Sequence, residues 1–467
     1  LIFNSVMSIG KIPSAWKTAI VTPFFKKGPS SDPANYRPIS QTSIFCKLME
    51  RIIVAEMTDY LLHNNMITRH QHGFLNRRST ATNILECLSD WTLAIDNNQT
   101  RTVVYIDFAR AFDTVSRPKL MTKLKGYGIT GNLLQFISSF LHERNQKTRV
   151  GQSVSNAVQL TSGIVQGSCL GPLLFLIYIN DVTSIFDELV KPKLFADDLK
   201  LYTSVKSNDD CKLLQANLDK LAQWANDWQL KISSTKCCVM NIGKKTDAVN
   251  YYIDGQLLPS VDQVTDLGIT LDSKLRFSIH INKIVKKSIT RANLILKCFY
   301  SRDTSTLIKA FKVYVRPIIE YCSPAWSPHL VKDIILLESV QRKFTKRLPG
   351  MQNIPYPQRL KQLGLERLDV RRLRADLMLA YKIIFGIVAD IDISNFFTVC
   401  RNEYNTRGHR FKLLATLAKR DTRHYFYSLR VVRVWNSLPD DTNFSSLLRF
   451  KKSFYCANLH NVCTVCY

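Results

Sequence analysis

The chain has 467 residues, of which 46% are apolar, so it can bury a large core spread over roughly two to four domains. Its 64 Lys and Arg outnumber 37 Asp and Glu, which gives a net charge of +27. This composition excludes a disordered tail. The longest apolar run, Leu173 to Ile179, is far shorter than the roughly 18–20 residues of a membrane-spanning helix, so we expect no membrane partner.

The positive charge is concentrated in the second part of the chain. Residues 276–467 hold 34 basic and 13 acidic side chains, whereas residues 1–275 hold 30 and 24. Each Lys or Arg placed on a phosphate releases a condensed counterion, so a polyanion is the natural partner of such a field. No strongly amphipathic basic helix stands alone at a terminus, so the charge indicates nucleic acid rather than an anionic membrane.

Cysteines and termini say little about function. The 12 cysteines are scattered over a chain too long to need a disulfide framework, which indicates reduced thiols in the cytosol or nucleus. The first residues, Leu1 to Phe3, show no initiator Met and no secretory signal, so we expect an internal cut. Four possible zinc ligands with very tight spacing lie near the C-terminus: Cys456, His460, Cys463 and Cys466. The favoured alternative is that these cysteines are free thiols in a frayed terminus.

In chain order, apolar periodicity first predicts helices over 44–62 and 81–95. The apolar positions of the first helix are Ile44, Leu48, Ile52, Ala55 and Leu62. The β-branched and aromatic run 103–106 predicts a buried strand that ends at Asp107. Two further helices are expected over 119–125 and 133–141, separated by glycines at 126, 128 and 131.

The pattern changes in the second half of the chain. Residues 193–203 predict two short strands around the acidic hairpin tip Ala196-Asp197-Asp198. An amphipathic helix follows over 213–230, and helical patterns continue from 275 to 348. The Pro-rich stretch 349–357 is an expected boundary. The chain therefore combines a mixed α/β first part with a basic, helical second part.

Acidic residues stand where two predicted strands end or turn. If the strands are neighbours about 4.8 Å apart, Asp107 and Asp197 share one edge of the sheet. Crowded carboxylates repel one another, and hard divalent cations such as Mg²⁺ relieve that repulsion. Since successive strand residues face opposite sides, Asp197 is the stronger candidate for direct metal bridging than Asp198, unless a tight turn relaxes the alternation. The alternative is an ordinary turn and a solvated strand end.

An ordered set of motifs resembles the reverse transcriptase of non-LTR (LINE-type) retrotransposons. The set comprises Pro13-Ser14-Ala15-Trp16-Lys17, Pro23-Phe24-Phe25-Lys26-Lys27-Gly28, Asn35-Tyr36-Arg37-Pro38-Ile39-Ser40, Gln71-His72-Gly73-Phe74, Asp107-Phe108-Ala109-Arg110-Ala111-Phe112-Asp113, Gly163-Ile164-Val165-Gln166-Gly167-Ser168, Gly171-Pro172-Leu173-Leu174-Phe175 and Phe195-Ala196-Asp197-Asp198. The resemblance covers roughly residues 11–272 and continues more weakly to Arg430 through Pro439.

The resemblance implies an α+β right-hand polymerase with an antiparallel palm sheet. Fingers would cover 1–100, the palm 101–272 and a helical thumb 273–348, followed by a basic, mainly helical C-terminal region over 349–467. Asp107, Asp197 and Asp198 match the palm carboxylates. By resemblance they hold two Mg²⁺ ions, with Mn²⁺ as a possible substitute, together with the backbone carbonyl of Phe108. The primer 3′-hydroxyl would then attack the α-phosphate of a dNTP and expel pyrophosphate.

Several residues match nucleotide contacts of the family. Phe112 matches the aromatic that collides with a ribose 2′-hydroxyl, and ordinary core packing is its alternative. Lys26 and Arg37 match the fingers segment that grips the triphosphate, although Lys26 and Lys27 also read as a solvated pair. Gln166 and Gly167 match residues that touch the nucleotide or template, with a buried structural Gln as the alternative.

Two weaker matches follow the palm motifs. Lys236 matches the lysine that protonates departing pyrophosphate, but Ser233 to Cys237 replaces the Asn-x-x-Lys-Thr common in the family. Residues 266–272 resemble the primer-grip hairpin, with Asp266 where an aromatic commonly precedes Leu-Gly. A thumb that tracks a duplex also needs phosphate contacts, for which the helical stretch offers Lys283, Lys286, Lys287, Arg291, Lys297, Lys309 and Lys312. Scattered solubilising charge is the alternative there.

The sequence therefore predicts an RNA-directed DNA polymerase of a LINE-type element. It would extend a DNA primer on an RNA template with dNTPs, act in the nucleus and cytoplasm, and assemble with its element RNA in a ribonucleoprotein. Two alternatives stay open. One is an inactive nucleic-acid-binding relic, against which the intact carboxylates argue. The other is an intron-encoded or retron-type reverse transcriptase, against which the motifs at 71–74 and 435–439 argue.

Overall fold

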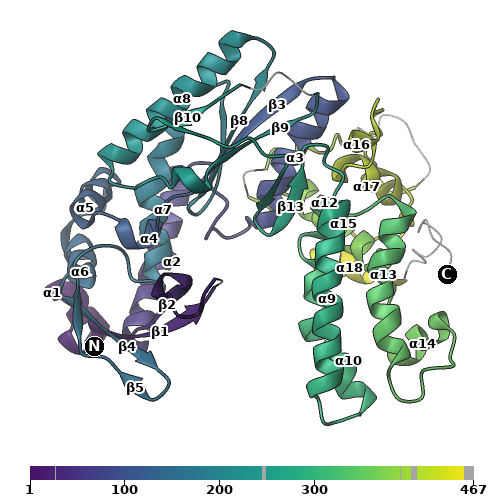
Figure 1. Cartoon of the computed structure of the whole chain (residues 1–467), viewed down its shortest axis with the longest axis horizontal. Coiled ribbons are helices and arrows are strands. Elements are labelled where there is room, and N and C mark those ends of the chain that lie inside the picture. The colour runs from purple at the N-terminus through teal and green to yellow at the C-terminus, as the bar shows by residue number, and fades with distance from the viewer. Residues whose placement is uncertain (27, 245–248, 390, 401–407, 457–467) are drawn as a thin grey trace.

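A four-stranded antiparallel sheet in the order β7-β8-β3-β9 forms the centre of the computed structural model, which describes residues 1–26, 28–244, 249–389, 391–400 and 408–456 (Figure 1). Its strands are β3 Thr100–Ile106, β7 Lys191–Phe195, β8 Asp198–Val205 and β9 Cys238–Ile242. Val103 faces a core shared with α3 (Thr80–Asp96) and the C-terminal half, whereas Val104 and Ile106 face a second core. The apolar run of β3 is thus explained by burial on both faces.

Helices of the N-terminal half build the second core. They include α4 Ala111–Thr114, α5 Arg117–Gly126, α6 Gly131–Leu141, α7 Leu170–Ile179 and α8 Asn208–Asp227. Helix α7 is almost completely buried, so the longest apolar run of the sequence is an interior helix. Across the whole described part of the chain, no helix combines the length and the apolar character needed to cross a membrane.

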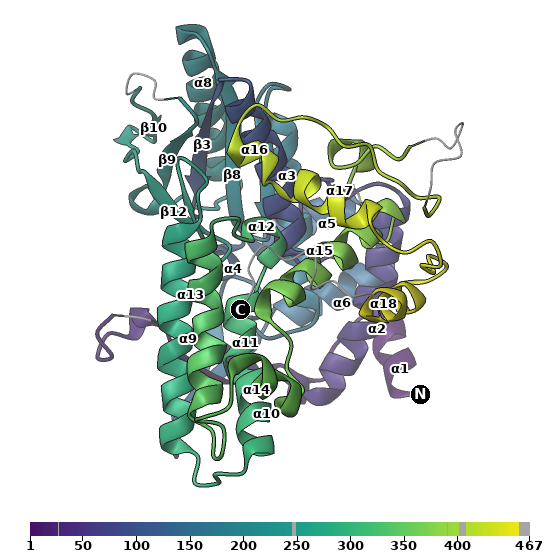
Figure 2. The ribbon, with the colours of Figure 1, turned by 90° about the vertical axis from the view of Figure 1, so that its right-hand side faces the viewer.

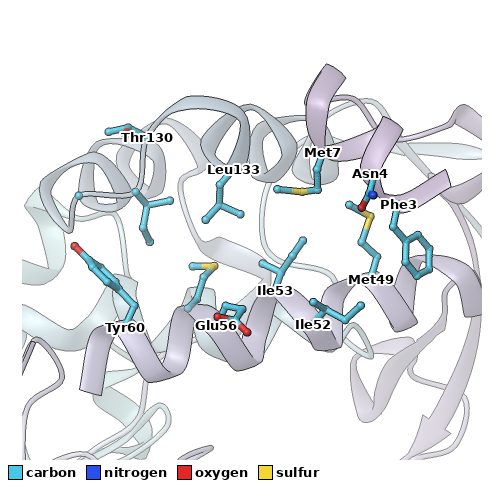
Figure 3. Close-up of a pocket in the computed structure, with 13 residues that line it drawn as sticks. Phe3, Asn4, Met7, Met49, Ile52, Ile53, Glu56, Tyr60, Thr130 and Leu133 are labelled. Atoms are coloured by element: carbon cyan, nitrogen blue, oxygen red, sulfur yellow. The ribbon is translucent and has the colours of Figure 1, made fainter. Parts of the chain in front are cut away.

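A second sheet, in the order β2-β1-β4-β5 with β6 paired to β4, lies at the N-terminal end (Figure 1). Its strands are β1 Thr18–Phe25, β2 Tyr36–Gln41, β4 Arg144–Val150, β5 Ser153–Val154 and β6 Val158–Leu160. Nearby, helices α1 (Ile2–Ile9), α2 (Ile44–His63) and α6 line an apolar cavity of about 640 Å³, into which Met7, Ile53 and Leu133 project (Figure 3).

Helix α2 forms as predicted, but the apolar positions that the sequence pattern singled out do not face the core. Ile44, Leu48 and Ile52 are exposed by 74%, 45% and 57%. The buried side instead carries Cys46, Met49, Glu50, Ile53, Met57 and Leu61. The helix therefore has two apolar stripes, and packing against α7 selects the one that the sequence pattern did not single out.

The second half of the chain is helical after two short hairpins. The hairpins are β10 Tyr252–Ile253 with β11 Gln256–Leu257, and β12 Gln263–Asp266 with β13 Ile269–Asp272. The helices are α9 Ser278–Cys298, α10 Thr304–Tyr314, α11 Arg316–Glu320, α12 Ser323–Trp326, α13 Val331–Lys346, α14 Tyr356–Leu363, α15 Leu368–Ile384, α16 Asp421–His424, α17 Tyr427–Asn436 and α18 Leu447–Cys456. Long helices α9 and α13 pack side by side (Figures 1 and 2).

The last helices return to the side of the central sheet that α3 covers. Helix α16 lies against α3 (Figure 2), where the Arg423 guanidinium donates to the Ser89 carbonyl at 3.1 Å and to the Thr92 hydroxyl at 3.0 Å. One hydrophobic core joins residues from both sides of Pro349, from Ile281 to Phe450. The α+β architecture and the predicted helices and strands are confirmed, while the division into fingers, palm, thumb and C-terminal region stays a prediction.

Candidate active site

Three carboxylates gather at one end of the central sheet. Strands β3 and β8 are neighbours, and their last registered pair is Ile106 with Leu199. Asp107 follows β3 directly and Asp198 opens β8, so the two residues stand side by side one step beyond that pair. Asp197 lies in the two-residue turn that joins Phe195 to Asp198. The tight turn thus brings both neighbouring acids to the same end of the sheet.

Burial and the negative charges of neighbouring carboxylates raise the pKa values of Asp197 and Asp198. Partial burial and the negative charge of Asp107 raise the pKa of Asp197, while Arg37 and Lys26 oppose the rise. Burial together with Asp197, Asp266 and Asp107 raises the pKa of Asp198 to about 6. Carboxylates that disfavour one another's charge form a donor set that a hard divalent cation would stabilise.

Lys236 occupies the position beside Asp107. Its Nζ donates to Asp107 Oδ2 at 3.0 Å, and the two side chains are 65% and 39% exposed. In this arrangement, no group of three His, Cys, Asp or Glu side chains in the described ranges is placed to hold a metal ion. An ion pair this exposed contributes only about 0–1 kcal/mol, so it is a weak competitor for Asp107. The donor types fit Mg²⁺, provided that Lys236 releases the carboxylate.

The segment after α8 also fixes the backbone of Asp107. Ser233 N donates to the Asp107 carbonyl at 2.8 Å, and Asp107 N donates to Cys237 Sγ at 3.4 Å. Lys236 ends a 3-10 turn over Ser234–Lys236. The unusual Ser-Ser-Thr-Lys-Cys sequence therefore still delivers Lys236 to the acidic site. Phe108, the residue after Asp107, is buried and packs its ring edge-on against Trp224.

A buried glutamine holds the acidic turn from behind. Gln71 Oε1 accepts hydrogen bonds from the backbone N–H of Ala196 and of Gly73, both at 2.8 Å, and its Nε2 donates to the Ala196 carbonyl at 3.3 Å. Ala196 has φ of 57°, which costs a non-glycine residue about 1–2 kcal/mol. The Gln71 side-chain amide thus stabilises the left-handed backbone conformation of Ala196, which sets the position of Asp197.

Sequence reasoning missed this role of Gln71. The residue entered only as part of the motif 71–74, and a buried amide 125 positions away in sequence from its partner leaves no periodic signal. The motif's glycine has a geometric reason as well, because a Cβ on Gly73 would lie 2.4 Å from Ala196 N.

The β1–β2 hairpin brings basic residues to the acids. Arg37 pairs with Phe24 in the antiparallel register, and Lys26 follows β1 with its N–H on the Asn35 carbonyl at 2.8 Å. Burial and the positive charges of Arg37 and Lys236 lower the pKa of Lys26, whereas Asp107 and Asp197 raise it. These two cations and the carboxylates therefore act on one another. Lys27 lies outside the described residues.

Gln166 and Gly167 join this hairpin to helix α4. The Gln166 side-chain Nε2 donates to Asp113 Oδ1 at 2.7 Å, and the backbone carbonyl of Gln166 accepts from Ser40 N at 3.0 Å. Gly167 has φ of 105°, and a Cβ there would lie 2.4 Å from the Ser40 carbonyl oxygen. Gln166 is half-buried with a structural partner, so a contact with nucleotide stays a prediction.

Any reaction that this site catalyses should be about tenfold slower in Gly167→Ala, because β2, which carries Arg37, must move away from the new methyl group. Gly151→Ala is the matched control, since Gly151 also has a positive φ of 60° but nothing within 4 Å of its Cβ position. Steady-state kinetics and thermal melting check both variants. Equal losses in the two variants would show that backbone strain, and not the Ser40 contact, governs the effect.

Phe112 packs between a core ring and an exposed ring. Its ring stacks on the buried Phe175 at 4.4 Å between centroids and meets the exposed Phe74 edge-on at 6.1 Å. Phe112 itself is half-buried. Packing thus fixes one side of the Phe112 ring. That the ring excludes a ribose 2′-hydroxyl stays a prediction.

The basic residues of α9 share one face. Lys283, Lys286, Lys287, Arg291 and Lys297 are exposed, and their spacing places them opposite the buried Ile281, Val285, Ala292 and Ile295. Lys309 on α10 is exposed as well, while Lys312 is half-buried. This face is an electrostatic surface suited to phosphates.

The C-terminal motif is structural where it is described. Trp435 is fully buried, and its indole N–H donates to the Phe411 carbonyl at 2.6 Å. Arg430 pairs with the buried Asp376 at 3.0 Å. Of the possible zinc ligands, His460, Cys463 and Cys466 lie outside the described residues, and Cys456 is described only as the last residue of α18.

A family model described as reverse transcriptase (RNA-dependent DNA polymerase) matches residues 25–271, more than half of the chain. The chain belongs to this family. The RNA-directed DNA polymerase from mobile element jockey of Drosophila melanogaster is 29% identical over 362 residues, which cover 75% of this chain and 39% of that protein. The probable RNA-directed DNA polymerase from transposon BS of the same fly is 29% identical over 344 residues, which cover 70% and 37%.

These relatives confirm the resemblance to LINE-type reverse transcriptases. The chain spans about two fifths of the length of the curated relatives named here. Among solved structures, apo telomerase from Candida tropicalis aligns with a TM-score of 0.47 at 11% identity, covering 83% of this chain and 67% of that one.

Proposed function

We propose that this chain is an RNA-directed DNA polymerase of a non-LTR retrotransposon, which extends a DNA 3′-hydroxyl on an RNA template. The observation that carries the proposal is the meeting of Asp107, Asp197 and Asp198 at one end of the central sheet, facing Lys26 and Arg37 from the β1–β2 hairpin. A negatively charged centre for metal and a cationic rim for triphosphate are the two parts that nucleotidyl transfer needs.

Asp107, Asp197 and Asp198, with the backbone carbonyl of Phe108, would hold two Mg²⁺ ions, for which Mn²⁺ would substitute. When bound, such ions activate the attacking hydroxyl and stabilise the leaving phosphate oxygen. The side chains already disfavour one another's charge, which supports cation binding at this end of the sheet. Lys236, released from Asp107, would stand ready to give a proton to the departing pyrophosphate.

The remaining partners follow from charge and position. Lys26 and Arg37 would bind the triphosphate of the dNTP, and Gln166 with Gly167 would border the nascent base pair. The basic face of α9 would hold the phosphates of the RNA template and DNA primer without reading sequence. Assembly with the element RNA, and action in the nucleus and cytoplasm, belong to the same proposal.

The test is primer extension by the purified chain. With Mg²⁺ and dNTPs, we expect extension of a DNA primer on an RNA template, and loss of extension with EDTA. Parallel reactions on a DNA template measure template preference. A folded, nucleic-acid-binding protein that extends no primer with either Mg²⁺ or Mn²⁺ would instead favour the inactive relic.

Phe112→Ala should raise the incorporation of rNTPs relative to dNTPs, because the shortened side chain leaves room for a ribose 2′-hydroxyl. We expect a change of about tenfold or more in the ratio of kcat/KM values, or about 1.4 kcal/mol of discrimination. Phe112→Tyr keeps the ring and serves as the control, for which the ratio stays near wild type. An unchanged ratio in Phe112→Ala would assign Phe112 to packing against Phe175 alone.

A further inference from the structure

A buried ion pair lies next to the acidic site. Lys200 on β8 contacts Asp266 on β12, and their side chains are only 4% and 7% exposed. The pair joins two elements that are separate in the fold, the central sheet and the β12–β13 hairpin. It also accounts for the departure noted in the sequence, where Asp266 stands in place of an aromatic before Leu267 and Gly268.

Lys200 shares a strand face with a catalytic carboxylate. It follows Asp198 by two residues on β8, so both side chains point to the same side of the sheet. A small cavity of about 160 Å³ is lined by Asp107, Asp198, Lys200, Lys236 and Asp266, among others. The hairpin is therefore attached to the sheet within the same hollow that the carboxylates border.

The hairpin tip is held from the helical side as well. The Tyr321 hydroxyl, just after α11, donates to the Leu267 carbonyl at 3.0 Å. Gly268 has φ of 82°, and a Cβ there would lie 3.3 Å from the Tyr321 ring. On the other strand, Thr270 N donates to His280 Nδ1 of α9 at 3.2 Å. The tip thus has fixed contacts to the palm and to the helices that bear the basic face.

Stability alone does not require such a pair. Taking two charges out of water costs about as much as their attraction returns, and apolar pairs of similar volume are often equally stable. What an ion pair adds is a single geometry, because the lysine reaches one carboxylate in one orientation. Slippage of a two-stranded hairpin over the sheet is thereby prevented.

We propose that Lys200 and Asp266 are positioning residues that fix the β12–β13 hairpin over Asp107 and Asp198, and so place the primer 3′-hydroxyl for attack. The inference rests on the proposed polymerase function. Neither side chain is expected to touch substrate. Their effect passes through the hairpin, so they should govern the rate of the chemical step and leave the affinity for dNTP unchanged.

The double variant Lys200→Met/Asp266→Leu tests the proposal, because it removes both charges and leaves neither buried alone. In single-turnover extension we expect a rate at saturating dNTP at least fivefold below wild type. The KM for dNTP and the Kd for an RNA–DNA hybrid should stay within about twofold of wild type. The melting temperature should stay within a few degrees of wild type. A merely structural pair would either leave the rate unchanged, or its loss would lower the rate and the melting temperature while raising the KM for dNTP and the Kd for the hybrid.

Lys212→Met/Asp209→Asn is the matched control, since this ion pair on α8 is exposed at both ends by 72% and 90%. Wild-type kinetics are expected for this control.

Tyr321→Phe replaces the buried double variant as the test if that variant fails to fold. The half-exposed Tyr321 ring then loses only the hydroxyl that donates to the Leu267 carbonyl. A two- to fivefold lower rate with unchanged dNTP KM supports the proposal, and wild-type rates in the folded variants overturn it. Wild-type protein without activity would instead refute the polymerase function itself.

Discussion

Asp197→Asn should abolish primer extension, with a loss on the order of 10³-fold or more, about 4 kcal/mol of transition-state stabilisation. The amide keeps the shape of the side chain but removes the negative charge that would hold a metal ion between the primer and the triphosphate. Single-turnover extension on an RNA template measures the loss. Binding of the RNA should persist, since the basic face of α9 does not depend on Asp197.

Asp59→Asn provides the control, because Asp59 is an exposed acid on the outer side of α2. Its extension rate should equal that of wild type. Full activity of Asp197→Asn alongside it would remove Asp197 from the mechanism, and a parallel loss of RNA binding would point to general damage of the fold.

Gln71→Leu should reduce extension about 100-fold while the chain still folds. The substitution removes the three hydrogen bonds that Gln71 makes to Gly73 and Ala196 and leaves the buried Ala196 N–H without its acceptor, at about 1–3 kcal/mol. The turn can then relax from its left-handed conformation and carry Asp197 away. Extension kinetics and thermal melting measure the two consequences separately.

A second substitution tests the physical reason given for this effect. Glycine adopts a positive φ at little cost, so Gln71→Leu/Ala196→Gly should recover part of the lost activity. If the double variant extends primers no better than Gln71→Leu alone, the left-handed turn is not what Gln71 maintains.

The sequence predicted the elements that bear the carboxylates, because each has a strong local signal. Strand β3 is a short β-branched run followed by an acid, and the β7–β8 hairpin surrounds a turn of two acidic residues. That Asp107 and Asp198 meet follows from β3 and β8 being neighbours, which the motifs implied and the register shows.

Long-range polar contacts were beyond prediction from the sequence. Gln71 reaches Ala196 and Lys200 reaches Asp266, which lie 125 and 66 positions away, and no periodicity marks such pairs. The exposed stripe of α2 shows the same limit for apolar residues. Both of its stripes have helical spacing, and only the packing against α7 decides which one is buried.

The most direct test of the two-metal centre is a crystal structure of the chain with an RNA–DNA hybrid, a non-hydrolysable dNTP analogue and Mn²⁺, in which anomalous scattering locates the metal. We expect two manganese sites between Asp107, Asp197 and the triphosphate, with Lys236 no longer paired to Asp107. A bound nucleotide whose manganese touches none of the three carboxylates would contradict it.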